Sequence, residues 1–139
     1  MSIKHLIEKF DQINPNTESL YDVDAIIAEL QNHKEEANEA CESMFKIFER
    51  LEFGSYNSVL WSILHALEAL PAYEIELIKS VYRKPNEFNL RMINRNLNSG
   101  QKKYQSYNYV SILKELLNSE KLEEHLKQDV REYLEMHPD

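Results

Sequence analysis

The amino-acid sequence predicts an all-α protein of about eight short helices. Along most of the 139 residues, apolar side chains recur every three or four positions, which is the period of an amphipathic helix. The chain holds only two glycines and four prolines, too few for the turns that closely spaced β-hairpins need. Hydrophobic residues make up 42% of the chain, enough for one packed core, so we expect a single helical domain over residues 1–139.

The first helix is expected from Ile3 to Ile13, because the run Asn14-Pro15-Asn16 interrupts the helical pattern there. Asp22 or Asp24 is expected to cap a second helix, since a short acidic side chain accepts hydrogen bonds from the unpaired N–H groups of a first turn. The apolar side of this second helix is formed by Ala25, Ile26 and Leu30.

The third helix, predicted from Lys34 to Glu52, has the most regular pattern, and Phe53-Gly54-Ser55 is expected to end it. Its apolar stripe consists of Ala37, Cys41, Met44, Phe48 and Leu51. A second line at the same spacing contains Glu35, Glu39, Glu42, Lys46 and Glu49. If this segment is one helix, most positions along one of its faces are acidic.

A fourth helix is predicted from Val59 to Leu70, ended by Pro71. It is apolar around most of its circumference, which is typical of a helix at the centre of a domain. His65 lies in this helix, one turn from Trp61, and we expect it to be partly buried and bonded to a neighbouring helix rather than to serve a functional site.

The remaining sequence predicts four more helices with short connections. They are expected at Ile75–Tyr82, Asn86–Leu97, Tyr109–Leu117 and from Ser119-Glu120 to Leu134, with a loop at Gln101–Ser106. Helices this short are not stable alone, so they must pack on one another. Stacked antiparallel hairpins are the expected arrangement, either as a degenerate helical solenoid or as a compact bundle.

The net charge of −8 is distributed unevenly along the chain. Residues 1–52 contain twelve acidic and five basic residues, residues 53–110 four and seven, and residues 111–139 eight and four. A negative field disfavours nucleic acid and anionic membranes as partners, because both are polyanions. The charge pattern therefore favours a cationic protein partner.

The sequence contains no motif that predicts an enzyme, a metal site or a cofactor. No histidine has the Glu-x-x-His or His-Glu-x-x-His spacing of helical metal sites, and no Gly-x-Ser-x-Gly nucleophile motif is present. The only cysteine, Cys41, lies on an apolar stripe, where a small hydrophobic residue is expected. A single cysteine, no signal peptide and no apolar run of roughly 20 residues indicate a cytoplasmic protein.

The candidate partner-binding residues are acidic side chains and two tyrosines. Between Glu18 and Glu52 the chain has ten acidic and three basic residues, a pattern typical of the solvated face of amphipathic helices. The functional alternative is an electrostatic platform that steers and holds a basic protein. The acidic candidates are Asp22, Asp24, Glu29, Glu35, Glu36, Glu39 and Glu42. Tyr104 and Tyr107 are added as possible interface anchors, whereas Tyr109 is expected in the core.

Arg91, Arg95, Lys102 and Lys103, together with Tyr104, form the one basic and aromatic segment of the sequence. Such a segment can contact RNA phosphates and stack on a base, so an RNA-binding helical domain is one alternative. A solvated helix face and loop is the simpler interpretation. The same cations can also pair with the acidic helices of the chain itself.

Size, acidity and two apolar runs resemble the small helical immunity proteins of bacterial contact-dependent inhibition and polymorphic toxin systems, some of which have HEAT-like hairpins. The runs are Val59-Leu60-Trp61-Ser62-Ile63-Leu64-His65-Ala66-Leu67-Glu68-Ala69-Leu70-Pro71 and Tyr109-Val110-Ser111-Ile112-Leu113-Lys114-Glu115-Leu116-Leu117. The resemblance implies a non-catalytic inhibitor that binds one cognate toxin, commonly a nuclease with a cationic cleft, and occludes its active site. A helical scaffold or adaptor is the main alternative, and the oligomeric state is left open.

Overall fold

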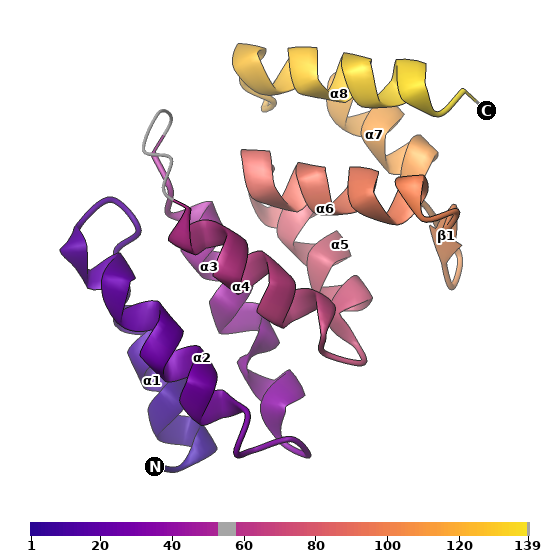
Figure 1. The fold of residues 1–139 in the computed structure, drawn as a ribbon. Helices are drawn as coiled ribbons and strands as arrows, with labels where there is room; N and C mark the ends of the chain where they lie inside the picture. The colour runs from indigo at the N-terminus through magenta and orange to yellow at the C-terminus, as the bar shows by residue number, and fades with distance from the viewer. Residues whose placement is uncertain (53–57, 139) are drawn as a thin grey trace. The chain divides into compact units, whose positions relative to one another are not determined.

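The computed structural model describes residues 1–52 and 58–138, which form eight α-helices, two short 3₁₀ helices and one two-stranded sheet (Figure 1). The all-α prediction is confirmed. The chain divides into two compact units, an N-terminal unit, Met1–Lys84, and a C-terminal unit, Pro85–Asp139. The expected helix end at Phe53-Gly54-Ser55 lies outside the described residues, as does Tyr56.

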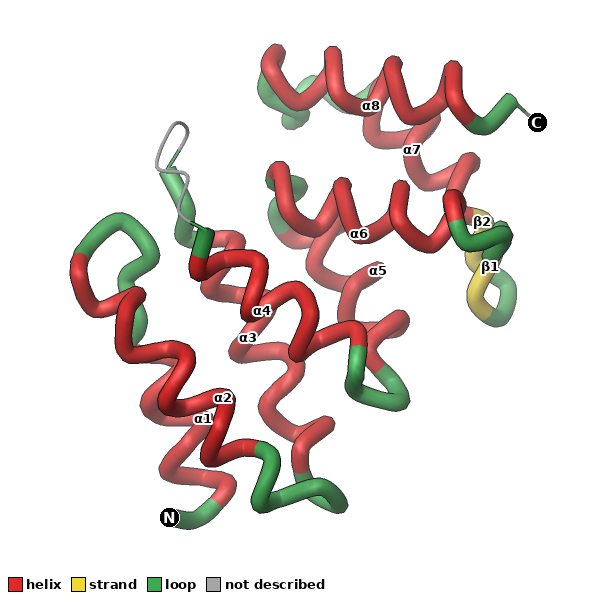
Figure 2. Tube along the Cα trace, viewed as in Figure 1, coloured by secondary structure: helices red, strands yellow, loops and turns green. Residues whose placement is uncertain are grey.

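The N-terminal unit is built from stacked helices that alternate between two layers (Figure 2). Its elements are α1 (Ile3–Gln12), η1 (Glu18–Asp22), α2 (Val23–Leu30), η2 (Ala37–Ala40), α3 (Cys41–Glu49), α4 (Val59–Glu68) and α5 (Tyr73–Arg83). In one layer α1 packs on α3 and α3 on α5, and in the other α2 packs on α4. Consecutive hairpins therefore lie side by side, as expected from helices too short to be stable alone.

The core of the N-terminal unit follows the apolar stripes read from the sequence. Phe10, Met44 and Phe48 are completely buried, and the rings of Phe45 and Phe48 meet edge to face with centroids 6.4 Å apart. Complete burial of one such side chain contributes about 1.5–3 kcal/mol. These contacts join the helices of the unit, so their removal is expected to unfold the unit rather than to loosen one helix.

Arg50, directly after α3, fastens the end of α1. Its guanidinium donates from Nε and Nη2 to the carbonyl oxygen of Ile13 at 3.1 and 2.8 Å, and from Nη2 to that of Phe10 at 3.0 Å. Asn16 completes the junction by donating from Nδ2 to the carbonyl of Arg50. Carbonyl groups at a helix C-terminus have no partner within the helix, and Arg50 supplies one. Burial lowers the pKa of Arg50, opposed by the charges of Asp11 and Glu49.

The second helix starts differently from the prediction. Thr17 caps η1 by accepting from the backbone N–H of Ser19, and α2 continues from η1 without a new cap. The side chain of Asp22 makes no capping hydrogen bond, and Asp24 lies within the first turn. Ile26 and Leu30 are buried as expected, but Ala25 is exposed.

The predicted third helix is broken, because regular α-helix begins only at Cys41. Residues 34–36 form turns, followed by η2, and successive i→i−3 hydrogen bonds such as Glu36 to His33 and Glu39 to Glu36 hold the segment. The residues have good helix propensity, but η2 packs on α1 with Ala40 fully buried. Tertiary packing outweighs propensity here, as is common for differences of a few tenths of a kcal/mol per residue.

The fourth helix packs on α2 and α3 through Leu60, Ile63, Leu64 and Leu67, but one side faces solvent. The prediction for His65 was wrong: its side chain is 62% exposed and lies 3.9 Å from the carboxylate of Glu68 on the same helix. Its ring centroid is 6.0 Å from that of Trp61, one turn earlier. The outer side of α4 therefore carries an exposed histidine beside a partly buried tryptophan.

The C-terminal unit consists of α6 (Glu87–Asn98), β1 (Lys103–Tyr104), β2 (Tyr107–Asn108), α7 (Tyr109–Leu117) and α8 (Glu124–Met136). Asn86 begins α6 as predicted, in a capping box with Asn89. The helix α8 packs on α6 and α7 and begins later than predicted, since Ser119 forms a turn instead of a helix start. Buried amides join the helices: Asn96 donates to the hydroxyl of Tyr109, and Asn94 bonds His137 at 3.0 Å.

A short β-hairpin replaces the predicted loop before α7. Tyr104 pairs with Tyr107, and Lys103 with Asn108, across a turn in which Gln105 has a φ of 53°. Glycine scarcity argued against such turns, but a single polar residue in the left-handed region is tolerated at a cost of about 1–2 kcal/mol. The hairpin is therefore a local exception in a helical protein.

Candidate partner-binding surface

The N-terminal unit holds nearly all of the net charge. From the sequence, residues 1–84 contain 15 acidic and 8 basic residues, a net charge of −7, whereas residues 85–139 contain 9 and 8, a net charge of −1. The unit whose helices alternate in two layers is therefore also the acidic one. An acidic surface on this unit favours approach of a cationic protein.

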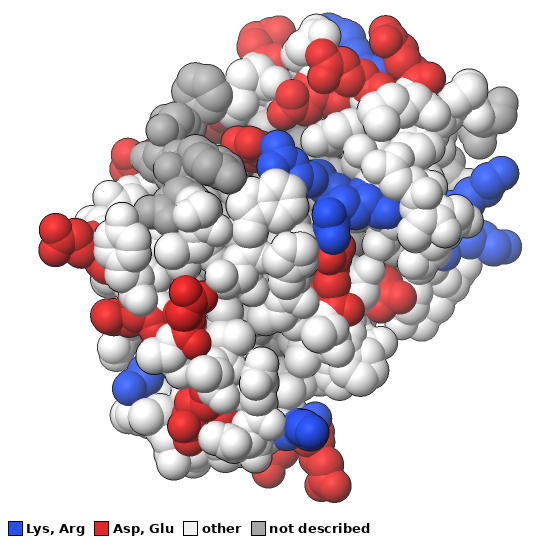
Figure 3. Space-filling model, in the orientation of Figure 1, with Lys and Arg blue, Asp and Glu red and all other residues white. Residues whose placement is uncertain are grey.

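The predicted acidic residues do not form one line. Asp22 and Asp24 lie at the start of α2, whereas Glu35, Glu36 and Glu39 follow its end. A helix of eight residues is about 12 Å long, so the two groups are separated by the length of α2. On the face drawn in Figure 3, the carboxylates likewise form separate groups with uncharged surface between them. The expected acidic face of one long helix was wrong, because residues 34–40 are not α-helical.

Two acids of the predicted line are paired within the chain. Arg83 of α5 donates from Nε and Nη2 to the two carboxylate oxygens of Glu49 at 2.9 and 2.7 Å, and Ser80 donates to the same carboxylate at 2.8 Å. Glu42 lies 3.4 Å from the ammonium of Lys46 and 3.8 Å from the guanidinium of Arg83. The hydrogen bond to Glu49 is the main reason that the pKa of Arg83 is raised. Glu49 thus joins α3 to α5.

Five of the predicted acids keep their charge uncompensated. In the described ranges 1–52 and 58–138, no ion pair involves Asp22, Asp24, Glu35, Glu36 or Glu39, and all five side chains are exposed. Exposed carboxylates of this kind lose little hydration free energy when a partner's cations approach at the edge of an interface. With the net charge of the N-terminal unit, these five residues are suited to steer a basic partner.

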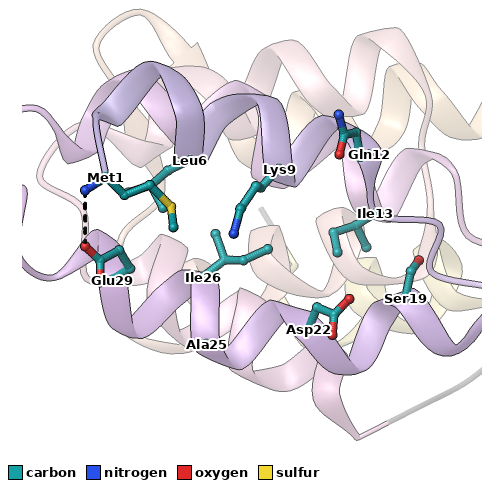
Figure 4. Close-up of a pocket in the computed structure, with 10 residues that line it drawn as sticks. All are labelled: Met1, Leu6, Lys9, Gln12, Ile13, Ser19, Asp22, Ala25, Ile26 and Glu29. Carbon is teal, nitrogen blue, oxygen red and sulfur yellow. Dashed lines mark ion pairs between the residues drawn. The ribbon is translucent and has the colours of Figure 1, made fainter.

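Asp22 and Glu29 lie at a pocket between α1 and α2, shown in Figure 4, with a volume of about 460 Å³. Lys9 reaches into the same pocket from α1, and the N-terminal amine lies 4.0 Å from the carboxylate of Glu29. Leu6, Ile13 and Ile26 supply apolar walls. The pocket therefore has apolar walls and charged side chains of both signs.

A second depression, of about 530 Å³, lies between the C-terminal ends of α2 and α4. We name it the α2–α4 groove, and it is lined by Ile27, Leu30, Gln31, Lys34, Ala37, Ala66, Ala69, Leu70 and Pro71. It was not predicted from the sequence. The sequence feature that could have predicted the groove is the set of alanines among large apolar residues, because small side chains leave room between packed helices.

Tyr104 and Tyr107 belong to the C-terminal unit and pair across the β-hairpin. Tyr107 is 38% exposed, Tyr104 is partly buried, and Tyr109 is completely buried as predicted. Lys102 and Lys103 are exposed beside them. The two tyrosines are accessible from solvent and suited to an interface, but nothing in their surroundings selects a partner.

Within the basic segment, Arg91 contacts two residues of its own helix. Arg91 pairs with Glu87 of the same helix at 3.0 Å and lies 5.6 Å from the centroid of the Phe88 ring. A guanidinium held in this way has less freedom to follow a phosphate backbone. Arg91 is therefore held by neighbours on its own helix, whereas Lys102 and Lys103 are exposed.

The described residues contain no group of three or more histidine, cysteine or acidic side chains that could hold a metal ion. Cys41 is buried, and burial, with smaller effects from Glu76 and Glu74, raises the pKa of its thiol to about 12. A thiol that stays protonated at neutral pH is a poor nucleophile. In residues 1–52 and 58–138 no helix has both the length and the apolarity that spanning a bilayer requires.

Comparisons of the chain with protein-family models, with curated proteins and with solved structures found no significant match. Function is therefore inferred from the charges, pockets and contacts described above.

Proposed function

We propose that this protein is an immunity protein that binds a cognate cationic toxin in the cytoplasm and neutralises it by covering the toxin's active site. The observation that carries the proposal is the net charge of −7 on the N-terminal unit, with five exposed carboxylates that have no ion pair among the described residues. The resemblance to small helical immunity proteins supplies the class of partner, a nuclease-type toxin.

The physical basis is competition for a cationic cleft. A nuclease binds phosphates through Lys and Arg side chains, and carboxylates of an inhibitor can occupy the same positions. Opposite charges also raise the association rate, because long-range attraction orients the partners before contact. Screening weakens this effect, since the Debye length falls from about 30 Å at 0.01 M to about 10 Å at 0.1 M salt.

The direct test is co-expression with the product of the adjacent gene. That product alone is expected to stop growth, and co-expression of this protein is expected to restore it. With purified proteins, the association rate constant should fall about tenfold or more between low and physiological salt. A neighbour that is neither toxic nor bound by this protein sinks the proposal.

A pair of charge variants locates the effect on the surface. Glu35→Gln with Glu39→Gln removes two uncompensated carboxylates of the N-terminal unit, and Glu120→Gln with Glu135→Gln removes two exposed carboxylates of the C-terminal unit. Both double variants change the net charge equally. The first is expected to slow association several-fold more than the second. Equal effects of the two pairs would show that total charge, and not this surface, steers the partner.

A helical adaptor is the second candidate, favoured by the apolar character of the α2–α4 groove. An adaptor is expected to bind several partners with moderate affinity, whereas an immunity protein binds one partner tightly. Affinity capture at increasing salt separates the two, because only a tight, well-packed complex is retained once electrostatic attraction is screened.

A further inference from the structure

The α2–α4 groove combines apolar walls with two carboxylates, Glu35 and Glu36, in an adjoining shallow pocket. Leu30, Leu70 and Ile27 supply the large apolar side chains, and the alanines at 37, 66 and 69 keep the groove open. Its volume of about 530 Å³ lies within the range of about 300–1,000 Å³ that is typical of ligand and anchor pockets. An apolar side chain of a partner can therefore be buried here.

The groove extends onto an aromatic surface of α4. Trp61, His65 and Ala69 are spaced four residues apart, so they lie in one row along the helix. Ala69 lines the groove, and the other two form the ring pair whose centroids are 6.0 Å apart. Tryptophan at an accessible position is the side chain most often found as an energetic anchor of interfaces. The row therefore places a partly buried tryptophan and an exposed histidine on the same side of α4 as Ala69.

Charge at the opening favours a basic ligand. The C-terminal ends of α2 and α4 meet there, and each carries partial negative charge from its last carbonyl groups. The last turn of α2 contains no basic residue, whereas the last turn of α4 contains His65. Glu35 and Glu36 lie on the adjoining turn, in a shallow pocket that shares Gln31 and Lys34 with the groove. Among the described residues that line the groove, Lys34 is the only cation.

We propose that the α2–α4 groove receives an amphipathic basic helix of the partner, whose apolar side fills the groove while its Lys or Arg side chains face Glu35 and Glu36. The inference deepens the proposed function and rests on it, since the helix belongs to the toxin. Helix-in-groove recognition of this type reads apolar anchors at helical spacing and uses flanking charges for specificity.

The test fills the groove with a large side chain. Ala69→Trp places an indole at an exposed position that lines the groove, and Ala28→Trp places the same side chain at an exposed position of α2 that lines neither pocket. Dissociation constants are measured with the adjacent gene product by surface plasmon resonance. Ala69→Trp is expected to weaken binding by about 100-fold and Ala28→Trp by less than about threefold. Circular dichroism melting of both variants establishes that they are folded.

The outcomes separate this inference from the proposed function. Absence of binding by the wild-type protein refutes the proposed function. Tight wild-type binding that Ala69→Trp leaves unchanged refutes the groove and keeps the proposed function. Sedimentation of the wild-type chain alone tests whether a second copy of the chain occupies the groove. A dimer that Ala69→Trp converts to monomer would assign the groove to that second copy and overturn the inference.

A defined probe tests the chemistry of the ligand without the toxin. Two labelled amphipathic peptides of about four helical turns, one made of Leu and Lys and the other of Leu and Glu, are each titrated with the protein. Fluorescence anisotropy reports the binding of each peptide. The Lys peptide is expected to bind about tenfold or more tightly than the Glu peptide, and Lys34→Ala is expected to strengthen that binding several-fold by removing the opposing cation. Equal binding of both peptides, or Lys-peptide binding that Ala69→Trp does not reduce, would contradict the proposal.

Discussion

Glu49 is predicted to be a structural ion-pair residue, so its loss should destabilise the N-terminal unit. Its side chain is only 11% exposed, while that of Arg83 is 31% exposed, and three hydrogen bonds of 2.7–2.9 Å reach the carboxylate. Exposed pairs contribute about 0.2–1 kcal/mol, and removing one partner of a buried pair costs about 3–5 kcal/mol. This pair lies between those limits, so Glu49→Ala should cost about 2–3 kcal/mol and the coupling energy with Arg83 should be about 1–2 kcal/mol.

Urea unfolding measures the loss of stability of the N-terminal unit. Trp61 is the only tryptophan of the chain and lies on α4, so its fluorescence reports on the N-terminal unit. With a slope of about 2 kcal/mol/M, a loss of about 2.5 kcal/mol lowers the urea midpoint by about 1.2 M. The single variants Glu49→Ala and Arg83→Ala and the double variant complete a double-mutant cycle. Single-variant losses that simply add in the double variant would refute the reasoning, because the two side chains would then act independently.

Two further predictions concern the interior of the same unit. Burial raises the pKa of the Cys41 thiol from 9.0 to about 12. Above pH 9 the unfolded state therefore releases a proton that the folded state retains, and the free energy of unfolding should fall by about 1.4 kcal/mol per pH unit. Urea unfolding of the wild type and of Cys41→Ala between about pH 8 and 10.5 checks this, and parallel pH profiles would contradict it. Arg50→Ala removes three hydrogen bonds to the carbonyls of Phe10 and Ile13, so it should cost about 2 kcal/mol, with Arg50→Lys losing less. Thermal melting followed by circular dichroism measures this, and a melting temperature unchanged in Arg50→Ala would show that water replaces the guanidinium.

Helix content and most of the core were predictable because they depend on local periodicity. Met44, Phe48 and Tyr109 were expected inside and are completely buried, because the side chains of a regular apolar stripe leave water only when that face of the helix is packed. Asn86 begins α6 as expected because a capping side chain bonds to N–H groups two or three residues away. A capping signal of this kind involves only residues within about one turn of helix, so it can be recognised in the sequence.

The candidate site was less predictable because it depends on residues distant in the sequence. Glu42 and Glu49 were part of an expected acidic face, yet Arg83, more than thirty residues later, pairs with both. His65 was expected to be partly buried and is exposed, because the neighbours of α4 cover only one side of it. Charge pairing and exposure are properties of packed helices, and periodicity does not encode which helices meet.

The sequence alone therefore determined that the chain is helical, that its core follows the apolar stripes and that its negative charge is concentrated near the N-terminus. Only the tertiary structure decided that residues 34–40 leave the regular helix, since burial of Ala37 and Ala40 against α1 outweighs the helix propensity of the segment. It also decided which carboxylates stay uncompensated, because an ion pair forms only where folding brings opposite charges within about 4 Å. The α2–α4 groove has the same origin: two helix ends, more than thirty residues apart in the sequence, meet with small side chains between them.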